Sequence, residues 1–563
     1  MPLVFGVTAW FLIAAHALFG QQMPTVAPDT IFYNGKIIMV DSSFSIQEAF
    51  AVRGDQIWAV GSNAQVRALA GPQTRSVDLL GHAVIPGMMD NHNHQYHAAL
   101  MSLRGVDLEG IHSLAEMLDR IRQGVAAAPP GKTVSTTVGW NPTEFPEKRP
   151  PNRQDLDQVS PNNPVVVYQS RSLAYLNTAA LNLLGINRDV NAIGRAVIAK
   201  DPSGNPTGAI SGAPAAVLNL TAKVVPQPTI DEKKDILLRI AQRQLALGLT
   251  SIRDLQLHPE AMRAYYELWR EERLPMRISA GLEANPEEVD LVDGMLRNWG
   301  VGAGFGDAWL RLDCVAEFNP GTLLREPFTE PAGNYFGELS LSEEKFAEAI
   351  RVMNRYDWRP SPHIDGDKTL DMVLDAYEAA DRERSIRDRR WIVEHIALVQ
   401  PDQMDRMKRL GVMVSAQIQP YRGARGMVRR WGEKRAVRAV PMRELLDHGL
   451  IVSGGSDWGG GEPTNNPFVN IYFYVTRNTL ELGPFGVAQK ISRAEAIRVE
   501  TINNAYLTYE EKIKGSIEPG KLADFLILSH DILTVPEDQI RSILPLATYV
   551  GGRKVFSKPQ EGF

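Results

Sequence analysis

Residues 84–94 read VIPGMMDNHNH, an apolar run, a Pro-Gly turn and a second short run that ends in two histidines. This pattern indicates a buried strand, a turn and a second strand with the histidines at its far end. Because side chains alternate between the two faces of a strand, Asp90, His92 and His94 are expected on one face. Two converging imidazoles suit a metal ion, but hydrogen-bonded core histidines fit the same pattern. Further candidate ligands elsewhere in the chain are needed to distinguish the two interpretations.

The composition is ordinary for a globular enzyme and narrows the chemistry. The 563 residues include 60 Lys and Arg against 66 Asp and Glu, for a net charge of −6. This slight acidic excess argues against a nucleic-acid-binding protein, which presents a basic face. The single cysteine, Cys314, excludes an intrachain disulfide and any multi-cysteine metal site. Any metal must therefore be held by nitrogen and oxygen ligands.

The N-terminus resembles an export signal. Residues 1–22 contain an apolar run and, at 15–17, a small-residue motif like a signal-peptidase site, although basic residues are absent before Lys36 and Met23 is an alternative start. The run is too short and too interrupted for a stable membrane span. We expect a signal peptide at 1–22 and an exported, periplasmic or secreted protein, or a cytoplasmic one if the leader is not genuine.

Both ends of the chain are rich in short strand patterns with Gly-containing turns. We expect them to form one small β-sandwich domain from residues 24–85 and 510–563. Between them, residues 86–509 alternate strand-like runs with amphipathic helical stretches, which is typical of an α/β fold of the (β/α)8 TIM barrel type. Residues 105–230 are too long for one connecting helix and are expected to form an insertion near the barrel mouth.

Eight strand candidates fit such a barrel, and its active site is expected at their C-terminal ends. The candidates begin near residues 84, 250, 277, 310, 361, 391, 412 and 451. Six metal-capable side chains fall at the ends of these strands: His92, His94, Glu317, His363, His395 and Asp457. A chance scatter of the eleven histidines would rarely place four of them this way, so the six positions together predict a metal site.

Several stretches resemble the amidohydrolase superfamily. VIPGMMDNHNH is similar to its Pro-Gly-x-x-Asp-x-His-x-His opening, and the likeness covers nearly the whole chain after the leader. The closest resemblance is to the YtcJ-like amidohydrolase 3 family, the branch that includes N-substituted formamide deformylase. The stretches that carry this resemblance are PHIDGDKTLDMVLDAYEAA at 362–380, IVSGGSDW at 451–458 and GSIEPGKLADFLIL at 515–528.

The resemblance implies one or two divalent metal ions, with Zn²⁺ as the expected ion, which generate hydroxide by lowering the pKa of water to about 7. His92 and His94 match the first-strand metal pair of the family. His363 and His395 match the histidines of strands 5 and 6. Asp457 matches the aspartate of strand 8, which the resemblance assigns as a metal ligand and as the catalytic group that moves the proton.

Strand 4 leaves an alternative open. Superfamily members often carry a carboxylated lysine or a glutamate there, but LRLDCVAEF at 310–318 contains no lysine. Glu317 is the expected ligand because it lies at the C-terminal end of the strand, and Asp313 is the alternative. A salt-bridged residue on the barrel rim is the other interpretation of Glu317.

Positions expected to contact substrate depart from the family. Ser172 stands where the family often has histidine, and Arg422 stands where histidine frequently follows the Gln-Pro of strand 7. Formamide deformylation itself is therefore in doubt. Four residues are candidates for lining the pocket: Trp140, Tyr421, Arg422 and Trp458. The alternatives are core packing for the aromatic residues and a solvated helix face for the arginine.

Three classes of function remain. The first is a metal-dependent amidohydrolase that hydrolyses the C–N bond of an amide, N-acyl or cyclic amide substrate through metal-bound hydroxide. The second is a metal-dependent lyase, isomerase or decarboxylase on the same scaffold. The third, a non-catalytic binding homologue, is disfavoured by the retained ligand set. The expected partner is a small-molecule substrate, with no nucleic acid and no stable membrane span, and a homo-oligomer is left open.

Overall fold

The computed structural model describes residues 26–559, except 104, 109, 139, 144, 171, 213, 332 and 460–463. The expected leader at 1–22 lies outside the described residues. Every helix in the described part of the chain is too short or too polar to cross a bilayer.

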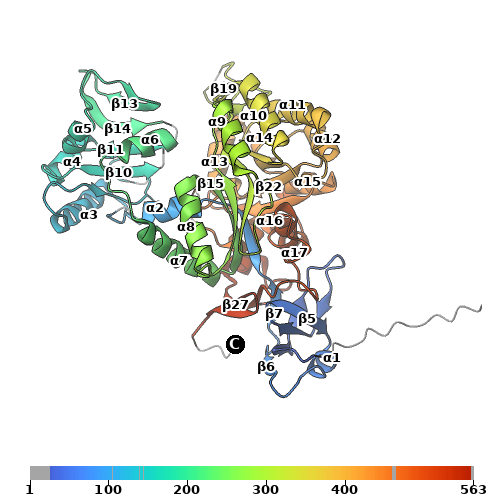
Figure 1. Ribbon diagram of the computed structural model, residues 1–563. Coiled ribbons are helices and arrows are strands. Elements are labelled where there is room, and N and C mark those ends of the chain that lie inside the picture. Colours follow the sequence, from blue (N-terminus) through green and yellow to red (C-terminus); the bar gives the residue numbers. More distant parts are fainter. Residues whose placement is uncertain are drawn as a thin grey trace, which may run out of the picture.

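A sheet of eight parallel strands forms the centre of the molecule (Figure 1). Its strands are, in spatial order, β8 (Met88–Asn93), β15 (Leu249–Leu257), β16 (Arg277–Leu282), β17 (Leu310–Phe318), β20 (Pro360–Ile364), β21 (Ile392–His395), β22 (Met413–Gln417) and β23 (Val452–Gly455). An isolated parallel bridge between Asn93 and Trp458 joins the two edges, so that the sheet nearly closes. The predicted barrel is confirmed. Its strands are those expected from the sequence, except that the first begins at Met88 and not near residue 84, because residues 83–86 pair into a different sheet.

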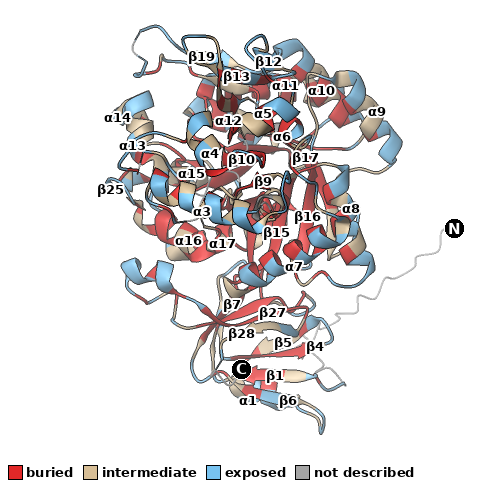
Figure 2. Cartoon of the chain, turned by 90° about the vertical axis from the view of Figure 1, so that its left-hand side faces the viewer, coloured by how far each residue is buried: buried red, intermediate tan, exposed pale blue. Residues whose placement is uncertain are grey.

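Helices surround the barrel and cover its outer face (Figure 2). They are α2 (Gln95–Ser102), α7 (Ile230–Ala246), α8 (Pro259–Arg270), α9 (Val289–Trp299), α10 (Glu343–Arg355), α11 (Asp367–Glu383), α12 (Pro401–Leu410), α13 (Gln419–Trp431), α14 (Glu433–Ala436), α15 (Met442–Asp447), α16 (Pro467–Thr476), α17 (Arg493–Val499) and α18 (Ile502–Leu507). The main hydrophobic core lies between these helices and the strands.

Local sequence explains why these helices form. Helix α10 begins after Ser342, whose side chain accepts a hydrogen bond from the Lys345 amide, and it buries Phe346, Ile350 and Met353 on one face. Helix α7 has a reciprocal cap between Thr229 and Glu232. The strands between the helices are buried on both faces, as in other parallel sheets.

The two ends of the chain form a β-sandwich beneath the barrel (Figures 1 and 2). One sheet contains β5 (Gln56–Gly61), β4 (Ala49–Arg53), β1 (Thr30–Tyr33) and β6 (Arg75–Asp78). The other contains β28 (Arg553–Ser557), β27 (Pro545–Val550), β26 (Phe525–Leu528), β7 (Ala83–Pro86), β2 (Lys36–Ile38) and β3 (Ile46–Gln47). Both chain ends supply its aromatic core, in which Phe32 stacks on Phe50 and Phe525 stacks on Tyr549.

The insertion after β8 and α2 is a separate layer beside the barrel (Figure 1). Its sheet consists of β9 (Val134–Ser135), β10 (Val165–Ser170), β11 (Leu173–Leu176), β14 (Pro206–Ser211), β13 (Ala196–Lys200) and β12 (Ala192–Ile193). Its helices are α3 (Leu114–Ala127), α4 (Arg153–Val159), α5 (Thr178–Leu183) and α6 (Pro214–Thr221). Two hydrophobic clusters of its own hold it together.

A buried ion pair joins the sandwich to the floor of the barrel. Arg277, the first residue of β16, donates from Nε and Nη2 to the two carboxylate oxygens of Asp524, at 2.6 and 2.8 Å. Asp524 lies just before β26, and its Oδ1 also accepts a hydrogen bond from the Gly551 amide. The sandwich is thus fixed to the N-terminal ends of the strands, opposite the rim where the site is expected.

Asp524→Ala is expected to destabilise the protein by about 3–5 kcal/mol, because it leaves the Arg277 guanidinium buried without its main counter-charge. The measurement is the thermal unfolding midpoint. Glu537→Ala is the control, since it breaks an exposed pair with Lys490 and should cost no more than about 1 kcal/mol. Equal midpoints for the two variants would contradict this role of the buried pair.

Candidate metal centre

The six predicted side chains meet at the rim formed by the C-terminal strand ends. His92 comes from β8, His363 from β20 and His395 from β21. Glu317 is the next to last residue of β17. His94 lies just past the end of β8, and Asp457 lies two residues past β23. Strands separated by most of the chain thus contribute to one cluster.

Glu317 lies at the centre of this cluster. Its Oε1 is hydrogen-bonded to His395 Nε2 at 2.8 Å and to His363 Nδ1. Its Oε2 lies 3.5 Å from His92 Nε2 and 3.4 Å from His94 Nε2. Each of the two oxygens of the Glu317 carboxylate therefore faces a different pair of histidines.

Asp457 completes the set on the side of the first-strand histidines. Its Oδ1 lies 3.5 Å from His92 Nε2 and 3.4 Å from His94 Nε2. Two backbone hydrogen bonds of 2.8 Å hold it there, from the Asp457 amide to the His92 carbonyl and from the His94 amide to the Trp458 carbonyl. Both bonds connect the end of β23 to the end of β8.

Three of the four histidines use their second ring nitrogen to contact a polar side chain outside the cluster. His92 Nδ1 lies 2.7 Å from Glu394 Oε2, and His363 Nε2 lies 3.2 Å from Asp365 Oδ2. His395 Nδ1 lies 2.5 Å from Gln419 Nε2. Such outer partners fix the ring orientation of metal-binding histidines.

Sequence reasoning missed these outer partners. A signal existed for Glu394, because a charged residue inside the buried strand WIVEH needs a partner in the barrel interior. Asp365 follows β20 by one residue and Gln419 follows β22 by two, at strand ends where polar residues are common. Asp90, which strand alternation places beside His92, is instead bonded to Ser456 and Asn93.

The electrostatics of the cluster favour positive charge. Burial lowers the pKa of His92, but the carboxylates of Glu394 and Glu317 outweigh burial and raise this pKa to about 10. Burial raises the pKa of Glu317, yet the surrounding imidazoles hold it well below its ordinary value. For His363, burial is again outweighed, here by Asp365 and Glu317, and its pKa lies well above the ordinary value. Protons or a cation are therefore stabilised at this rim.

The donor set fits a divalent metal ion. In three overlapping trios the candidate ligand atoms lie within 4.8 Å of one another: His92, His94 and Glu317; His92, His395 and Asp457; Glu317, His363 and His395. Within the described residues, the buried Nε2 of His92 has no hydrogen-bond partner although it points into this cluster. A cation would satisfy this nitrogen and the acidic oxygens together.

Asp313, the alternative on strand 4, lies outside the cluster. Its Oδ2 accepts a hydrogen bond of 2.5 Å from Arg253 Nε, and its Oδ1 is paired with Arg359. All three groups are fully buried. Of the two acidic residues, the structure brings only Glu317 to the histidines.

The four residues proposed to line the substrate pocket lie in different environments. Trp458 directly follows Asp457 and is half-buried at the rim. Tyr421 is buried in the first turn of α13, with ring contacts to Tyr472 and Phe473. The segment after β22 is thus a helix from Gln419 onward.

Arg422 lies on an exposed helix surface, and Trp140 lies in a buried core. Arg422 is exposed on α13. Trp140 is buried in the core of the insertion, where its Nε1 donates to the Tyr168 carbonyl at 2.9 Å. The structure does not bring Trp140 to the predicted site, because the insertion uses it to cover its own sheet.

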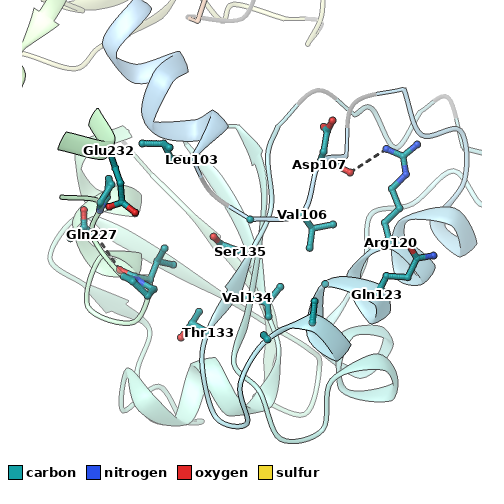
Figure 3. A pocket seen from close by; sticks show the side chains of 17 residues that line it. Leu103, Val106, Asp107, Arg120, Gln123, Thr133, Val134, Ser135, Gln227 and Glu232 are labelled. Atoms are coloured by element: carbon teal, nitrogen blue, oxygen red, sulfur yellow. Dashed lines mark hydrogen bonds between the residues drawn. The ribbon is translucent and has the colours of Figure 1, made fainter. Parts of the chain in front are cut away.

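A cavity of about 660 Å³ lies between the insertion and the segment that precedes α7 (Figure 3). It is lined by the backbone and side chains of residues such as Val106, Val134 and Gln227, with Asp107 and Arg120 at one end. None of the predicted metal ligands is among its lining residues. This cavity is separate from the rim cluster.

Comparison with known proteins gives matches over nearly the whole chain. A family model described as "Amidohydrolase family" matches residues 75–556. The protein LONG AFTER FAR-RED 3 of Arabidopsis thaliana is 28% identical, over 98% of this chain and 96% of that protein. N-substituted formamide deformylase of Arthrobacter pascens is 27% identical, over 93% of this chain and 97% of that enzyme. An uncharacterized metal-dependent hydrolase from Pyrococcus horikoshii OT3 superposes with a TM-score of 0.72, at 24% identity, over 90% and 99% of the two chains.

Glu317→Gln is expected to lower the amount of divalent metal that co-purifies with the protein, because an amide cannot offer an anionic oxygen to each histidine pair. Elemental analysis of the purified protein measures this. Glu500→Gln is the matched control: this carboxyl is also buried but lies outside the cluster, and burial raises its pKa well above the ordinary value. Similar metal loss in both variants would contradict the central role of Glu317.

Proposed function

The chain belongs to the amidohydrolase family, and on this premise we propose that it hydrolyses a C–N bond of an amide, N-acyl or cyclic amide substrate with the help of Zn²⁺. The observation that carries the proposal is the position of the Glu317 carboxylate between two pairs of histidines. Its Oε2 faces His92 and His94. Its Oε1 faces His363 and His395. This arrangement offers two neighbouring metal positions that share one carboxylate.

The residues divide between the two positions as follows. His92 and His94 would hold one ion together with Asp457 and the Oε2 of Glu317. His363 and His395 would hold the other with Oε1 of Glu317. When bound, the metal polarises the carbonyl of the substrate and makes water acidic enough to attack at neutral pH. Nitrogen and oxygen donors without thiolate suit zinc, although they also suit other divalent ions.

Asp457 is the group best placed to move a proton. Its side chain is 17% exposed, against 6% for Glu317, so that of the two cluster carboxylates it lies closer to the open rim. Burial raises its pKa, but hydrogen bonding to His94 and nearby imidazole charge lower it below the ordinary value. An ionised Asp457 can accept a proton from the attacking water at its carboxylate and return it to the leaving nitrogen.

The choice of a C–N bond rests on the family and on relatives. N-substituted formamide deformylase is named for action on such a bond and aligns with nearly the whole chain. This support concerns the class of bond, since Ser172 and Arg422 differ from the histidines that the resemblance leads one to expect at those positions. The proposal therefore names an amide-type substrate without singling out a formamide.

Removal of metal should abolish hydrolysis of the best substrate found in a panel of N-acyl amines, N-acyl amino acids and cyclic amides. Dialysis against a strong chelator is expected to lower kcat/KM by at least about 100-fold, and Zn²⁺ should restore it. Amine release reports the reaction. Unchanged hydrolysis by protein shown to be metal-free would overturn the proposed mechanism.

The metal-holding and proton-moving roles can be separated by substitution. His94→Ala should lose metal and activity together, whereas Asp457→Asn should lower kcat by about 100- to 10,000-fold with a much smaller loss of metal. His448→Ala is the control, because this histidine contacts the Glu444 carbonyl away from the rim. A fully active Asp457→Asn enzyme would show that Asp457 has been assigned the wrong role.

A further inference from the structure

A network of buried ion pairs lies directly beneath the cluster of candidate metal ligands. Arg253 of β15 donates to Glu394 of β21 at 2.6 Å and to Asp313 of β17 at 2.5 Å. Further hydrogen bonds reach the Asn91 carbonyl of β8 at 3.0 Å, the Ser361 hydroxyl of β20 at 2.8 Å and Cys314 Sγ of β17 at 2.9 Å. One guanidinium thus connects the strands that carry His92, Glu317, His363 and His395.

Glu394 links this network to the metal cluster. Its Oε2 faces His92 Nδ1 at 2.7 Å, and its Oε1 accepts from Arg253 Nη1 and from the Ser361 hydroxyl. Glu394 is fully buried, and both of its oxygens are used. An arginine side chain can only donate hydrogen bonds. The atom of residue 394 that faces Arg253 must therefore be an acceptor, as Oε1 of Glu394 is.

We infer that Glu394 and Arg253 are a pair of positioning residues that decide which nitrogen of His92 is available to the metal. Glu394 accepts a hydrogen bond from Nδ1–H of His92, so Nε2, which faces Glu317 and Asp457, is the nitrogen that can give up its proton and offer a lone pair to an incoming cation. Arg253 keeps Glu394 in this orientation. The inference rests on the proposed metal-dependent function but concerns residues outside the ligand set.

The sharpest consequence concerns an amide at position 394. In Glu394→Gln, Arg253 would attract the amide oxygen, and the NH2 group would then face His92 Nδ1. Nδ1 must accept that hydrogen bond, so the ring proton moves to Nε2 and blocks the ligand lone pair. Metal binding would require the amide to turn its NH2 toward Arg253, which is unfavourable because two donors then face each other.

Asp365 provides a matched control at another histidine of the same cluster. It contacts His363 Nε2 at 3.2 Å, and its side chain is 36% exposed. The described contacts include no arginine hydrogen bond that dictates its orientation, so an asparagine there can turn its oxygen toward His363. Asp365→Asn removes the same charge as Glu394→Gln without imposing a ring tautomer.

The experiment measures Zn²⁺ affinity by chelator competition, with circular dichroism and the unfolding midpoint as checks on folding. Glu394→Gln is expected to bind at least one Zn²⁺ about 100-fold more weakly than the parent protein, and Asp365→Asn no more than about 10-fold more weakly. Glu394→Ala should bind more tightly than Glu394→Gln, because water in the space left can accept from His92 as well as donate. If Glu394 only filled space, Glu394→Gln would bind Zn²⁺ more tightly than Glu394→Ala.

A double variant tests the role of Arg253. Arg253→Met in the Glu394→Gln background frees the amide to present its oxygen to His92, with Ser361 accepting from the NH2 group, and should recover at least about 10-fold of the lost affinity. Equal affinities of the Gln and Ala variants would overturn the inference, as would a folded double variant without recovery. If the double variant does not fold, the order of the Gln and Ala variants decides. Absence of Zn²⁺ binding by the parent protein would instead overturn the proposed function.

Discussion

The two backbone hydrogen bonds between the ends of β23 and β8 determine whether a metal site exists at all. They run from the Asp457 amide to the His92 carbonyl and from the His94 amide to the Trp458 carbonyl. These residues lie at or just past the ends of the first and last strands of the barrel, which meet only when the sheet curves round on itself. Closure therefore brings Asp457 to the histidines, and a sheet left open at this seam would separate the ligand set.

The charges in the barrel interior are arranged in two levels with different chemistry. In the lower level, Arg253 and Arg359 are matched by Asp313 and Glu394, so that each buried charge has a hydrogen-bonded partner. Buried ions are tolerated only under this condition, since an unpaired charge is strongly destabilising. The upper level has two carboxylates among imidazoles and gains from an added cation. Glu394 belongs to both levels. The stability of the lower level and the chemistry of the upper level therefore depend on each other.

Much of the fold, and the meeting of the candidate ligands at one rim, could be predicted because both follow from short-range patterns. Strand runs separated by amphipathic helices predict a parallel barrel, and the rule that sites lie at strand C-termini then selects His363, His395 and Asp457. The outer partners could not be predicted in this way, because the contact of Glu394 with His92 depends on the relative rotation of strands far apart in the chain. Trp140 shows the same limit: nothing local distinguishes an aromatic residue that lines a pocket from one that covers a sheet.

The sandwich has a consequence for how the protein is made. Phe32 and Phe50 leave the ribosome long before Phe525 and Tyr549, which complete their core. At about 5–20 residues per second, the wait is on the order of a minute. During that time the first strands present an uncovered aromatic face that other nascent chains or chaperones can bind. A chain truncated before β26 would leave this face uncovered permanently, although all eight strands of its barrel sheet would be complete.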